Sequence, residues 1–449
     1  MNIFIAGGGR VGFYLARLLS VEGHDVTVIE AAAGTVERID AALDVSTIVG
    51  NAASVMLQKN GGVAKADLFV AVTGNNEVNL VAAATAKSLG ANQVVARVEN
   101  PIYVDGSILY ETILGIDYFL SPDGLTAQDI AKYIEQPGLI AGEDFGRGRV
   151  LMRQVRVTKS PTVNGKTLAD VIPPGSDTGV LLGVINRNGT IMTARGDATV
   201  EPGDLITLVG QREKMADAQK LFQGVEPRLD KVVIMGGGSV GLHLAQNLEN
   251  RQRNVKLFEH KLTRCQELAA TLNKTKVVYR DGTSRVALEE EHVDSADVFV
   301  ATSSDDERNI MSAVLAKEVG AKRTITVVHQ PDFAPLVTKL GIDHAVTPRA
   351  CIANRILRLV HQKSVSSLAV LEEGQIEILE FNVKGDAPII GNRLIDLRAK
   401  FPKEAVVATI IRGDQVIVPT GQDEIHAGDS AVVIATRDSL EAVRKFFLR

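Results

Sequence analysis

The chain alternates short apolar runs with stretches of helical periodicity, a pattern typical of a parallel β/α fold. Asn2–Ala6 is a short apolar run of the buried-strand type, and glycines follow it directly. After Gly12, the sequence FYLARLLSVEG places Leu15, Leu18 and Leu19 on one helix face. We count the later runs VTVIE, LFVAVTG and QVVARVENP as the second, third and fourth strands. This succession predicts a Rossmann-like, doubly wound parallel sheet.

The whole pattern occurs twice. The loop GGGRVG that begins at Gly7 returns as GGGSVG beginning at Gly236, an offset of 229 residues. VTVIE, ending at Glu30, returns as VKLFE, ending at Glu259, and DLFVAVTGNNEVN returns as DVFVATSSDDERN. Self-similarity at a fixed spacing is the signature of a repeated structural unit. We therefore predict a duplication.

Each copy continues into a smaller segment that is also repeated. VTKSPTVNGKTLAD resembles VKGDAPIIGNRLID, and EPGD corresponds to HAGD, each followed by an apolar strand and a closing helix. We expect an α/β protein with two tandem Rossmann-like sheets, each followed by a small α+β domain. Glycine and proline mark the transitions between these parts. The expected domain limits are 1–137, 138–226, 227–362 and 363–449.

The glycine loop has the composition of a dinucleotide-binding turn. Gly7 permits the tight turn, Gly9 lets the backbone approach a diphosphate, and Gly12 lets the helix pack close to the strand. The phosphates would lie at the helix N-terminus, where free N–H groups favour anions. Glu30 closes the second strand, where a carboxylate accepts hydrogen bonds from ribose hydroxyls and repels a 2′-phosphate. We expect NAD or an adenine nucleotide rather than NADP.

Two later strand ends face the same crevice. Thr73 and Gly74 end the LFVAVTG run and are candidates for the pocket lining, although a threonine here could equally be a helix N-cap without a ligand role. Arg97 lies near the end of QVVAR, where its charge could reach a phosphate. A surface ion pair is the alternative for this arginine.

The second copy keeps the glycines and Glu259, and Ser239 adds a hydroxyl beside the expected phosphate position. Val327 stands at the position of Arg97, so the second pocket has lost this cation. Binding of a nucleotide and a degenerate copy kept for assembly both remain open for this half. The residues that could compensate for the lost cation are Lys256, Arg280 and Arg323.

Composition narrows the class of protein. A formal net charge of −5 offers no basic surface for nucleic acid. The two cysteines lack a Cys-x-x-Cys spacing and the eight histidines form no metal motif. The start MNIFIAGGGR is no signal peptide, and the small-residue stretch after Asn79 is interrupted by Lys87, so we expect an intracellular chain without membrane spans.

These features together resemble the RCK (regulator of potassium conductance) family, as found in peripheral subunits of Trk-type potassium uptake systems. The resemblance covers the whole chain and rests on the doubled GGG(R/S)VG loops, the two strand-end glutamates, the segments DLFVAVTGNNEVN and DVFVATSSDDERNIMSAVLAKEVGAK, and the repeated small domain. It implies that NAD(H) and ATP or ADP bind in the crevice. It also implies a homotetrameric ring of eight RCK units beneath a potassium-translocating membrane subunit of the TrkH or TrkG kind.

The family's nucleotide contacts fall on both repeats. In the first copy the candidate residues are Gly7, Gly8, Gly9, Arg10, Val11, Gly12, Glu30, Thr73, Gly74 and Arg97. In the second they are Gly236, Gly237, Gly238, Ser239, Val240, Gly241 and Glu259. One departure is the loop Gly50-Asn51-Ala52-Ala53-Ser54, where such proteins often have Gly-Asp/His-Gly/Ala-Ser, so the contacts to the base are expected to differ.

A regulatory role is favoured over catalysis. Hydride transfer needs a positioned acid or base beside the nicotinamide, and the histidines stand at non-equivalent places in the two copies. We expect no enzyme, with a soluble NAD-dependent dehydrogenase as the alternative. The apolar helices LTAQDIAKYIEQ and ACIANRILRLVHQ are candidates either for subunit contacts or for packing inside one chain.

Overall fold

The computed structural model describes residues 1–104, 107–135, 139–158, 163, 166–172, 178–187, 189–194, 196–223, 229–361, 368–371 and 375–448. The chain divides into two compact units. Unit 1 consists of Met1–Glu135 and Leu229–Leu357, and unit 2 of Gln136–Arg228 and Arg358–Arg449. The three expected domain limits, at 137/138, 226/227 and 362/363, fall outside the described residues.

Unit 1 contains two six-stranded sheets, and every strand pair in them is parallel. Their strand orders, β3-β2-β1-β4-β5-β6 and β14-β13-β12-β15-β16-β17, are both the Rossmann order. The first sheet is formed by β1 (Asn2–Ala6), β2 (Asp25–Glu30), β3 (Ser46–Val49), β4 (Leu68–Ala71), β5 (Gln93–Arg97) and β6 (Tyr118–Leu120). The second is formed by β12 (Lys231–Met235), β13 (Asn254–Glu259), β14 (Lys276–Tyr279), β15 (Val298–Ala301), β16 (Arg323–Val327) and β17 (His344–Val346). The expected fold class is confirmed.

The strand numbering expected from the sequence is wrong by one. The edge strand β3 lies between VTVIE and LFVAVTG, so LFVA is the fourth strand and QVVAR the fifth. All four residues of β3 are exposed or half-buried, because an edge strand covers little of the core. Its sequence, STIV, therefore lacks the continuous apolar run by which the central strands were recognised.

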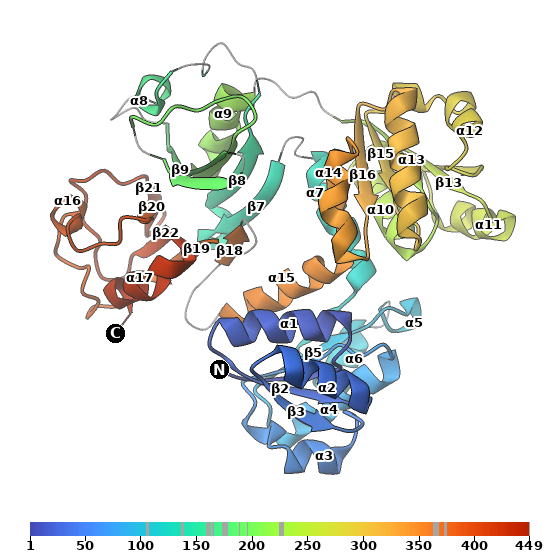
Figure 1. Cartoon of the computed structure of the whole chain (residues 1–449), viewed down its shortest axis with the longest axis horizontal. Coiled ribbons are helices and arrows are strands. Elements are labelled where there is room, and N and C mark those ends of the chain that lie inside the picture. The colour runs from blue at the N-terminus through green and yellow to red at the C-terminus, as the bar shows by residue number, and fades with distance from the viewer. Residues whose placement is uncertain are drawn as a thin grey trace. The chain divides into compact units, whose positions relative to one another are not determined.

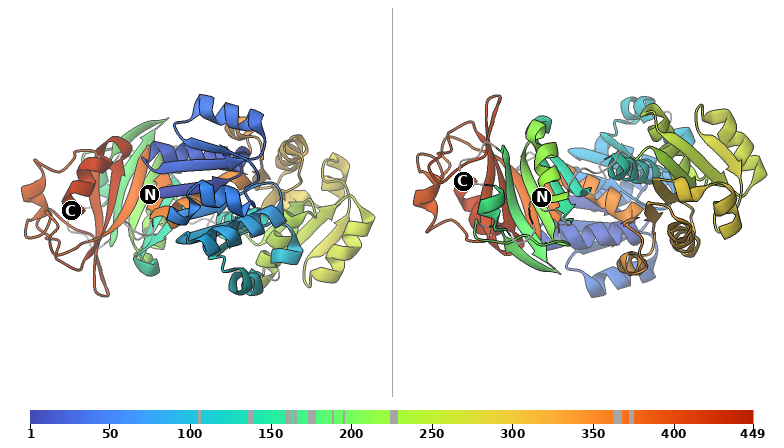
Figure 2. Two further views of the ribbon diagram at one scale, coloured as in Figure 1. Left: turned by 90° about the horizontal axis from the view of Figure 1, so that it is seen from below. Right: turned by 90° about the horizontal axis from the view of Figure 1, so that it is seen from above.

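Helices lie on both faces of the first sheet (Figure 2). The helices of the first repeat are α1 (Arg10–Val21), α2 (Ala33–Ala42), α3 (Val55–Asn60), α4 (Asn76–Leu89), α5 (Pro101–Val104), α6 (Ser107–Leu114) and α7 (Pro122–Glu135). Those of the second are α10 (Ser239–Asn250), α11 (Leu262–Thr271), α12 (Arg285–Glu290), α13 (Asp306–Val319), α14 (Ala334–Lys339) and α15 (Pro348–His361). Among the described residues, no helix is long and apolar enough to cross a membrane.

The last helix of the first repeat packs against the second repeat (Figure 1). Ala127, Ile130 and Ile134 of α7 belong to one buried cluster with strands β12 and β13 and with helix α10. An ion pair between Glu135 and Arg251, at 2.5 Å, closes the end of this contact. The apolar face of α7 is thus used for packing inside the chain, one of the two alternatives left open by the sequence. In α15, Cys351, Ile352, Ala353, Ile356 and Leu357 are also buried within this single chain.

Unit 2 contains two five-stranded antiparallel sheets, with orders β10-β9-β11-β8-β7 and β18-β19-β22-β20-β21, whose facing sides share one apolar cluster (Figure 2). The first small domain consists of β7 (Leu139–Phe145), β8 (Val150–Arg156), α8 (Leu168–Val171), β9 (Val180–Arg187), β10 (Thr190–Thr193), β11 (Leu205–Gln211) and α9 (Arg212–Gln223). The second consists of β18 (Leu368–Leu371), β19 (Ile376–Asn382), α16 (Leu394–Leu397), β20 (Ala405–Arg412), β21 (Gln415–Ile417), β22 (Ser430–Thr436) and α17 (Leu440–Phe447).

The repeated Gly-Asp pair of the small domains has a structural role. Asp204 is buried and accepts two hydrogen bonds from Arg187, at 2.9 and 2.8 Å. Asp429 and Arg412 form the same pair in the second domain, at 3.0 and 2.8 Å. The duplicated motif therefore marks a turn that is held by a bidentate ion pair.

Candidate nucleotide-binding site

The first glycine loop turns the chain tightly between β1 and α1. Gly7 has φ +105°, a backbone conformation that residues with a side chain rarely adopt. A Cβ on Gly12 would lie 1.8 Å from the Gly7 carbonyl oxygen, so only glycine lets α1 approach β1 this closely. A Cβ on Gly9 would meet no atom within 4 Å, which leaves this position open to a ligand. The backbone geometry shows the tight turn at Gly7 and the close helix–strand packing at Gly12.

Glu30 ends β2 with its carboxylate turned toward the loop. Its Oε2 accepts a hydrogen bond from the Gly8 amide at 2.6 Å, and its Oε1 accepts one from the Ala32 amide at 2.9 Å. Because a carboxylate oxygen accepts more than one hydrogen bond, both atoms can still accept from ribose hydroxyls. The acid is therefore fixed where a Rossmann fold binds the adenosine ribose.

The turn after β4 places Thr73 beside the loop. Its hydroxyl donates to Asn79 Oδ1 at 2.7 Å. The N-cap of α4 is Asn75, whose side chain accepts a hydrogen bond from the Val78 amide at 2.8 Å. The alternative of Thr73 as a helix cap is therefore wrong, because the capping position lies two residues further along.

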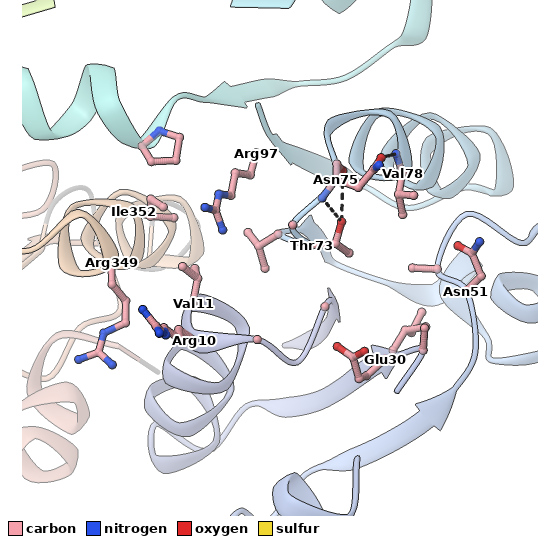
Figure 3. Close-up of a pocket in the computed structure, with 18 of the residues that line it drawn as sticks. Arg10, Val11, Glu30, Asn51, Thr73, Asn75, Val78, Arg97, Arg349 and Ile352 are labelled. Atoms are coloured by element: carbon pink, nitrogen blue, oxygen red, sulfur yellow. Dashed lines mark hydrogen bonds between the residues drawn. The ribbon is translucent and has the colours of Figure 1, made fainter. Parts of the chain in front are cut away.

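Arg97 is the last residue of β5, and its side chain points into the pocket (Figure 3). Its guanidinium pairs with Glu99, so the ion pair considered as an alternative is present. Asn79 Nδ2 donates to the Arg97 carbonyl at 3.0 Å and fixes the end of the strand. Within the described part of the chain, Arg97 Nε is buried without a hydrogen-bond partner. Such a donor costs free energy unless a ligand accepts from it.

These groups surround one cavity of about 650 Å³, a volume typical of small-molecule sites (Figure 3). Asn51, in the loop that departs from the family pattern, also lines it, as does Val78. Gly8 and Gly12 lie outside the lining and act through the loop backbone. The candidate residues that line the cavity are Gly7, Gly9, Arg10, Val11, Glu30, Thr73, Gly74 and Arg97.

The second repeat completes the wall of this cavity. His329, Pro348, Arg349 and Ile352 line it, from the loop after β16 and from the first two turns of α15. Sequence reasoning missed all four, because they are more than two hundred positions from the loop. The sequence signal that could have indicated this part of the wall is the proline and the charged residue that begin an apolar helix after the last strand of the repeat.

The second glycine loop has the same backbone design. Gly236 has φ +108°, and a Cβ on Gly241 would lie 2.0 Å from the Gly236 carbonyl oxygen. Glu259 accepts a hydrogen bond from the Gly237 amide at 2.9 Å. Gly238 precedes Ser239 and Val240, which begin α10. The part of this loop that resembles a nucleotide site is thus conserved between the repeats in geometry as well as in sequence.

The three residues that could compensate for the lost cation lie at different places in the second repeat. Arg323 begins β16, at the end of the strand opposite to Val327. Lys256 binds Glu291 at 3.0 Å. Arg280 lies 3.6 Å from Glu290. Among the described residues, no group of three histidines, cysteines or acids could hold a metal ion.

Family models cover most of the chain. A model described as the TrkA-N domain matches residues 3–122 and 232–348, and one described as the TrkA-C domain matches 152–223 and 378–448. Among curated relatives, the Trk system potassium uptake protein TrkA homolog of Archaeoglobus fulgidus is 35% identical over 448 residues, which covers 100% of both chains. The Trk system potassium uptake protein TrkA of Haemophilus influenzae is 31% identical, covering 100% of this chain and 98% of the relative.

Solved structures share the fold at lower identity. The GsuK channel superposes with a TM-score of 0.64 at 19% identity, covering 99% of this chain and 78% of that chain. The GsuK channel bound to NAD has a TM-score of 0.61 at 17% identity, with the same coverage. The GsuK RCK domain has a TM-score of 0.61 at 18% identity and is covered over 94% of its length. These likenesses show the fold of the two Rossmann-like and two small domains.

Proposed function

The chain belongs to the TrkA family of Trk-system potassium uptake proteins, and from that premise we propose that it is a nucleotide-sensing regulatory subunit of a potassium transporter. Its ligand is NAD(H) or ATP/ADP, bound at the first glycine loop. Its partner is a potassium-translocating membrane subunit of the TrkH or TrkG kind, and the chain works at the inner face of the membrane as a homotetramer. The second glycine loop, which has the same backbone design, either binds a second nucleotide or serves assembly, and the small domains transmit the signal.

The observation that carries this proposal is the composition of the first cavity. One wall is a glycine loop with an open position at Gly9 and a helix N-terminus behind it, the arrangement that binds a diphosphate. A second wall holds the Glu30 carboxylate, which is hydrogen-bonded to the Gly8 amide of the loop, and a third holds Arg97. These groups fit the ribose and the phosphates of one nucleotide. NAD and ADP are named in the solved GsuK structures, which supports the ligand class.

Regulation follows from where the cavity lies. Both repeats line it, through Arg10 on α1 and Arg349 on α15, so a ligand in the cavity contacts two Rossmann-like domains at once. A nucleotide shifts their relative arrangement only if it binds one arrangement more tightly than another. Ligands of different length and charge, such as NADH and ATP, meet this condition because they span the cavity differently. The partner then responds to the nucleotide that is bound.

The test is calorimetric titration of the purified chain with NADH, NAD, ATP and ADP. We expect at least one of them to bind. We also expect Glu30→Gln to weaken binding about tenfold or more, because the glutamine side chain keeps only one acceptor oxygen and places an NH2 donor opposite a ribose hydroxyl that also donates. Glu37→Gln is the matched control, since Glu37 is an exposed acid on α2 outside the cavity. Absence of binding by all four ligands would contradict the proposal.

The same samples separate a regulator from a dehydrogenase. A regulator binds NADH without oxidising it when small carbonyl compounds are added, whereas a dehydrogenase consumes NADH with one of them. Loss of NADH absorbance that depends on both the chain and a carbonyl substrate would favour the enzyme. We expect the absorbance to stay constant.

A further inference from the structure

The loop after β16 brings a histidine of the second repeat to the first cavity. His329 lines the cavity, and its side chain is 36% exposed. Its Nδ1 lies 2.7 Å from Oδ1 of Asp306, the first residue of α13. The buried Asp306 carboxylate also accepts hydrogen bonds from the backbone amides of His329, at 2.9 Å, and of Gln330, at 2.8 Å. The imidazole is therefore anchored by one nitrogen at the edge of the cavity.

This anchor determines what the other ring nitrogen offers to a ligand. A carboxylate only accepts hydrogen bonds, so the hydrogen of the neutral His329 ring is on Nδ1. Within the described ranges, no residue forms a hydrogen bond with Nε2. When Nε2 takes up a proton, the ring becomes a cation that is paired with Asp306 and donates a charge-assisted hydrogen bond to an anion. A carboxylate behind a histidine fixes both the tautomer and the orientation of the ring.

The first repeat has the same turn without this pair. Asn76 stands at the position of Asp306, and Glu99 at that of His329. Asn76 Oδ1 accepts a hydrogen bond from the Glu99 amide at 2.8 Å, just as Asp306 accepts one from the His329 amide. A neutral amide side chain is thus sufficient to hold the backbone here. The additional bond that the acid makes is the one to the imidazole, so the aspartate serves the orientation of the ring.

His329 reaches the cavity beside the start of α15. The Val328 amide donates to the Val346 carbonyl at 2.9 Å, so the segments that leave β16 and β17 run next to each other. The segment after β17 leads into α15, where Pro348 and Ile352 line the same cavity. The histidine and the first turn of this helix therefore belong to one wall.

This wall faces the end of the cavity where phosphates are expected. The start of α15 contacts α1, since the Arg349 guanidinium lies 4.5 Å from the centre of the Tyr14 ring. Figure 3 shows α15 on the same side of the cavity as Val11 and Glu30 on the opposite side. A diphosphate binds at the N-terminus of the first helix, and the adenosine ribose binds at the strand-end acid. His329 is thus placed to meet the phosphates.

We propose that His329 binds the phosphates of the nucleotide in the first cavity through Nε2, and that Asp306 positions its ring for this contact. The inference rests on the proposed function, since it assumes that a nucleotide occupies the cavity. The phosphates are then held by Arg97 at the end of β5 and by His329 after β16, the corresponding strands of the two repeats. A bound nucleotide links the two Rossmann-like domains through its charge.

The experiment is calorimetry of the full chain with ADP, whose adenosine and diphosphate are common to NAD, NADH and ATP. His329→Asn keeps a donor near the place of Nδ1 and loses Nε2, so we expect unchanged stability in urea and a loss of ADP affinity of about tenfold or more. His329→Gln keeps a donor near the place of Nε2, so we expect a smaller loss. His292→Asn is the control, because His292 is exposed outside the cavity and its φ of +57° suits asparagine.

Asp306→Asn tests the positioning role. The chain should fold, because Asn76 holds the same turn in the first repeat. We expect ADP affinity to fall about two- to tenfold, the value of one hydrogen bond. In the His329→Asn chain the same change should have no further effect on affinity, because Asp306 acts through the ring. Equal losses in both backgrounds would show that Asp306 acts on the fold alone and would overturn its positioning role.

Inorganic pyrophosphate, used as a competitor of ADP, tests whether the phosphates are the group that His329 binds. We expect it to compete about tenfold less well in His329→Asn than in the wild type. Equal competition in both chains, or wild-type ADP affinity in His329→Asn, would overturn the inference and leave the proposed function standing. A wild type that binds another of the four nucleotides but not ADP would also overturn the inference alone. A wild type that binds none of the four would overturn the proposed function itself.

Discussion

Two alanine substitutions in the first glycine loop separate folding from ligand binding. In Gly12→Ala the new Cβ would lie 1.8 Å from the Gly7 carbonyl oxygen and 3.0 Å from its carbonyl carbon. Both are backbone atoms, so the clash cannot be relieved by turning a side chain, and α1 must move away from β1. Overpacking of a tight interior costs about 1–3 kcal/mol, and we expect the upper end of that range.

In Gly9→Ala the stability is expected to be unchanged or slightly raised. The new Cβ meets no atom within 4 Å, and the backbone at Gly9, with φ −66° and ψ −166°, is accessible to any residue. Alanine at such a position gains about 0.4–1 kcal/mol by restricting the unfolded chain. The methyl group nevertheless points to the cavity that Gly9 lines, where it blocks the approach of a diphosphate. We expect at least a tenfold loss of nucleotide affinity.

Urea denaturation followed by circular dichroism measures the first effect, and calorimetric titration with the nucleotide that the wild type binds measures the second. Each variant is the control for the other, because both add one methyl group to the same loop, three positions apart. Wild-type stability in Gly12→Ala would refute the close approach of α1 to β1. Wild-type affinity in Gly9→Ala would show that the phosphates do not lie against the loop.

Three further changes test other parts of the account. Arg97→Ala should weaken nucleotide binding by about 1.5–3 kcal/mol, the value of a hydrogen bond to a charged group. An unchanged affinity in calorimetry would show that Arg97 does not bind the nucleotide. Burial lowers the pKa of His344 to about 4 in the folded chain, so below pH 6.5 the unfolded chain takes up a proton that the folded chain does not. The free energy of unfolding should therefore be about 2 kcal/mol lower at pH 5 than at pH 7, as measured by denaturation. In His344→Phe most of this pH dependence should be absent. Asp204→Asn should cost about 2–3 kcal/mol in the same assay by breaking the bidentate pair with Arg187, whereas Asp197→Asn, an exposed control, should cost little.

Much of the fold could be predicted from the sequence because its signals are local. The central strands are continuous apolar runs, the loops carry glycines at fixed spacing, and both recur in the second half. The edge strand β3 was missed because Ser46 and Val49 are exposed, which leaves too few buried positions to form a pattern. Strand-end residues such as Glu30 and Arg97 were placed at the pocket because parallel strands bring their carboxyl ends to one edge.

The part of the site that sequence reasoning missed depends on the packing of distant segments. His329 reaches the first cavity from the loop after β16 and Arg349 from the start of α15, and no local pattern encodes how these segments of the second repeat pack. The assignment of Thr73 as a possible helix cap failed for a smaller reason. Asn75, two residues further along, is a better cap than threonine, and its side chain accepts the hydrogen bond from the Val78 amide.

The central claim is that occupancy of the first glycine loop controls a potassium transporter. The direct measurement is rubidium flux into proteoliposomes that contain a Trk-type membrane subunit together with the wild-type chain or the Glu30→Gln chain, with and without NADH or ATP. The account predicts a flux that changes with nucleotide for the wild type and responds only at about tenfold higher nucleotide concentration for the variant. A flux that is the same with and without nucleotide in the presence of the wild-type chain would contradict it.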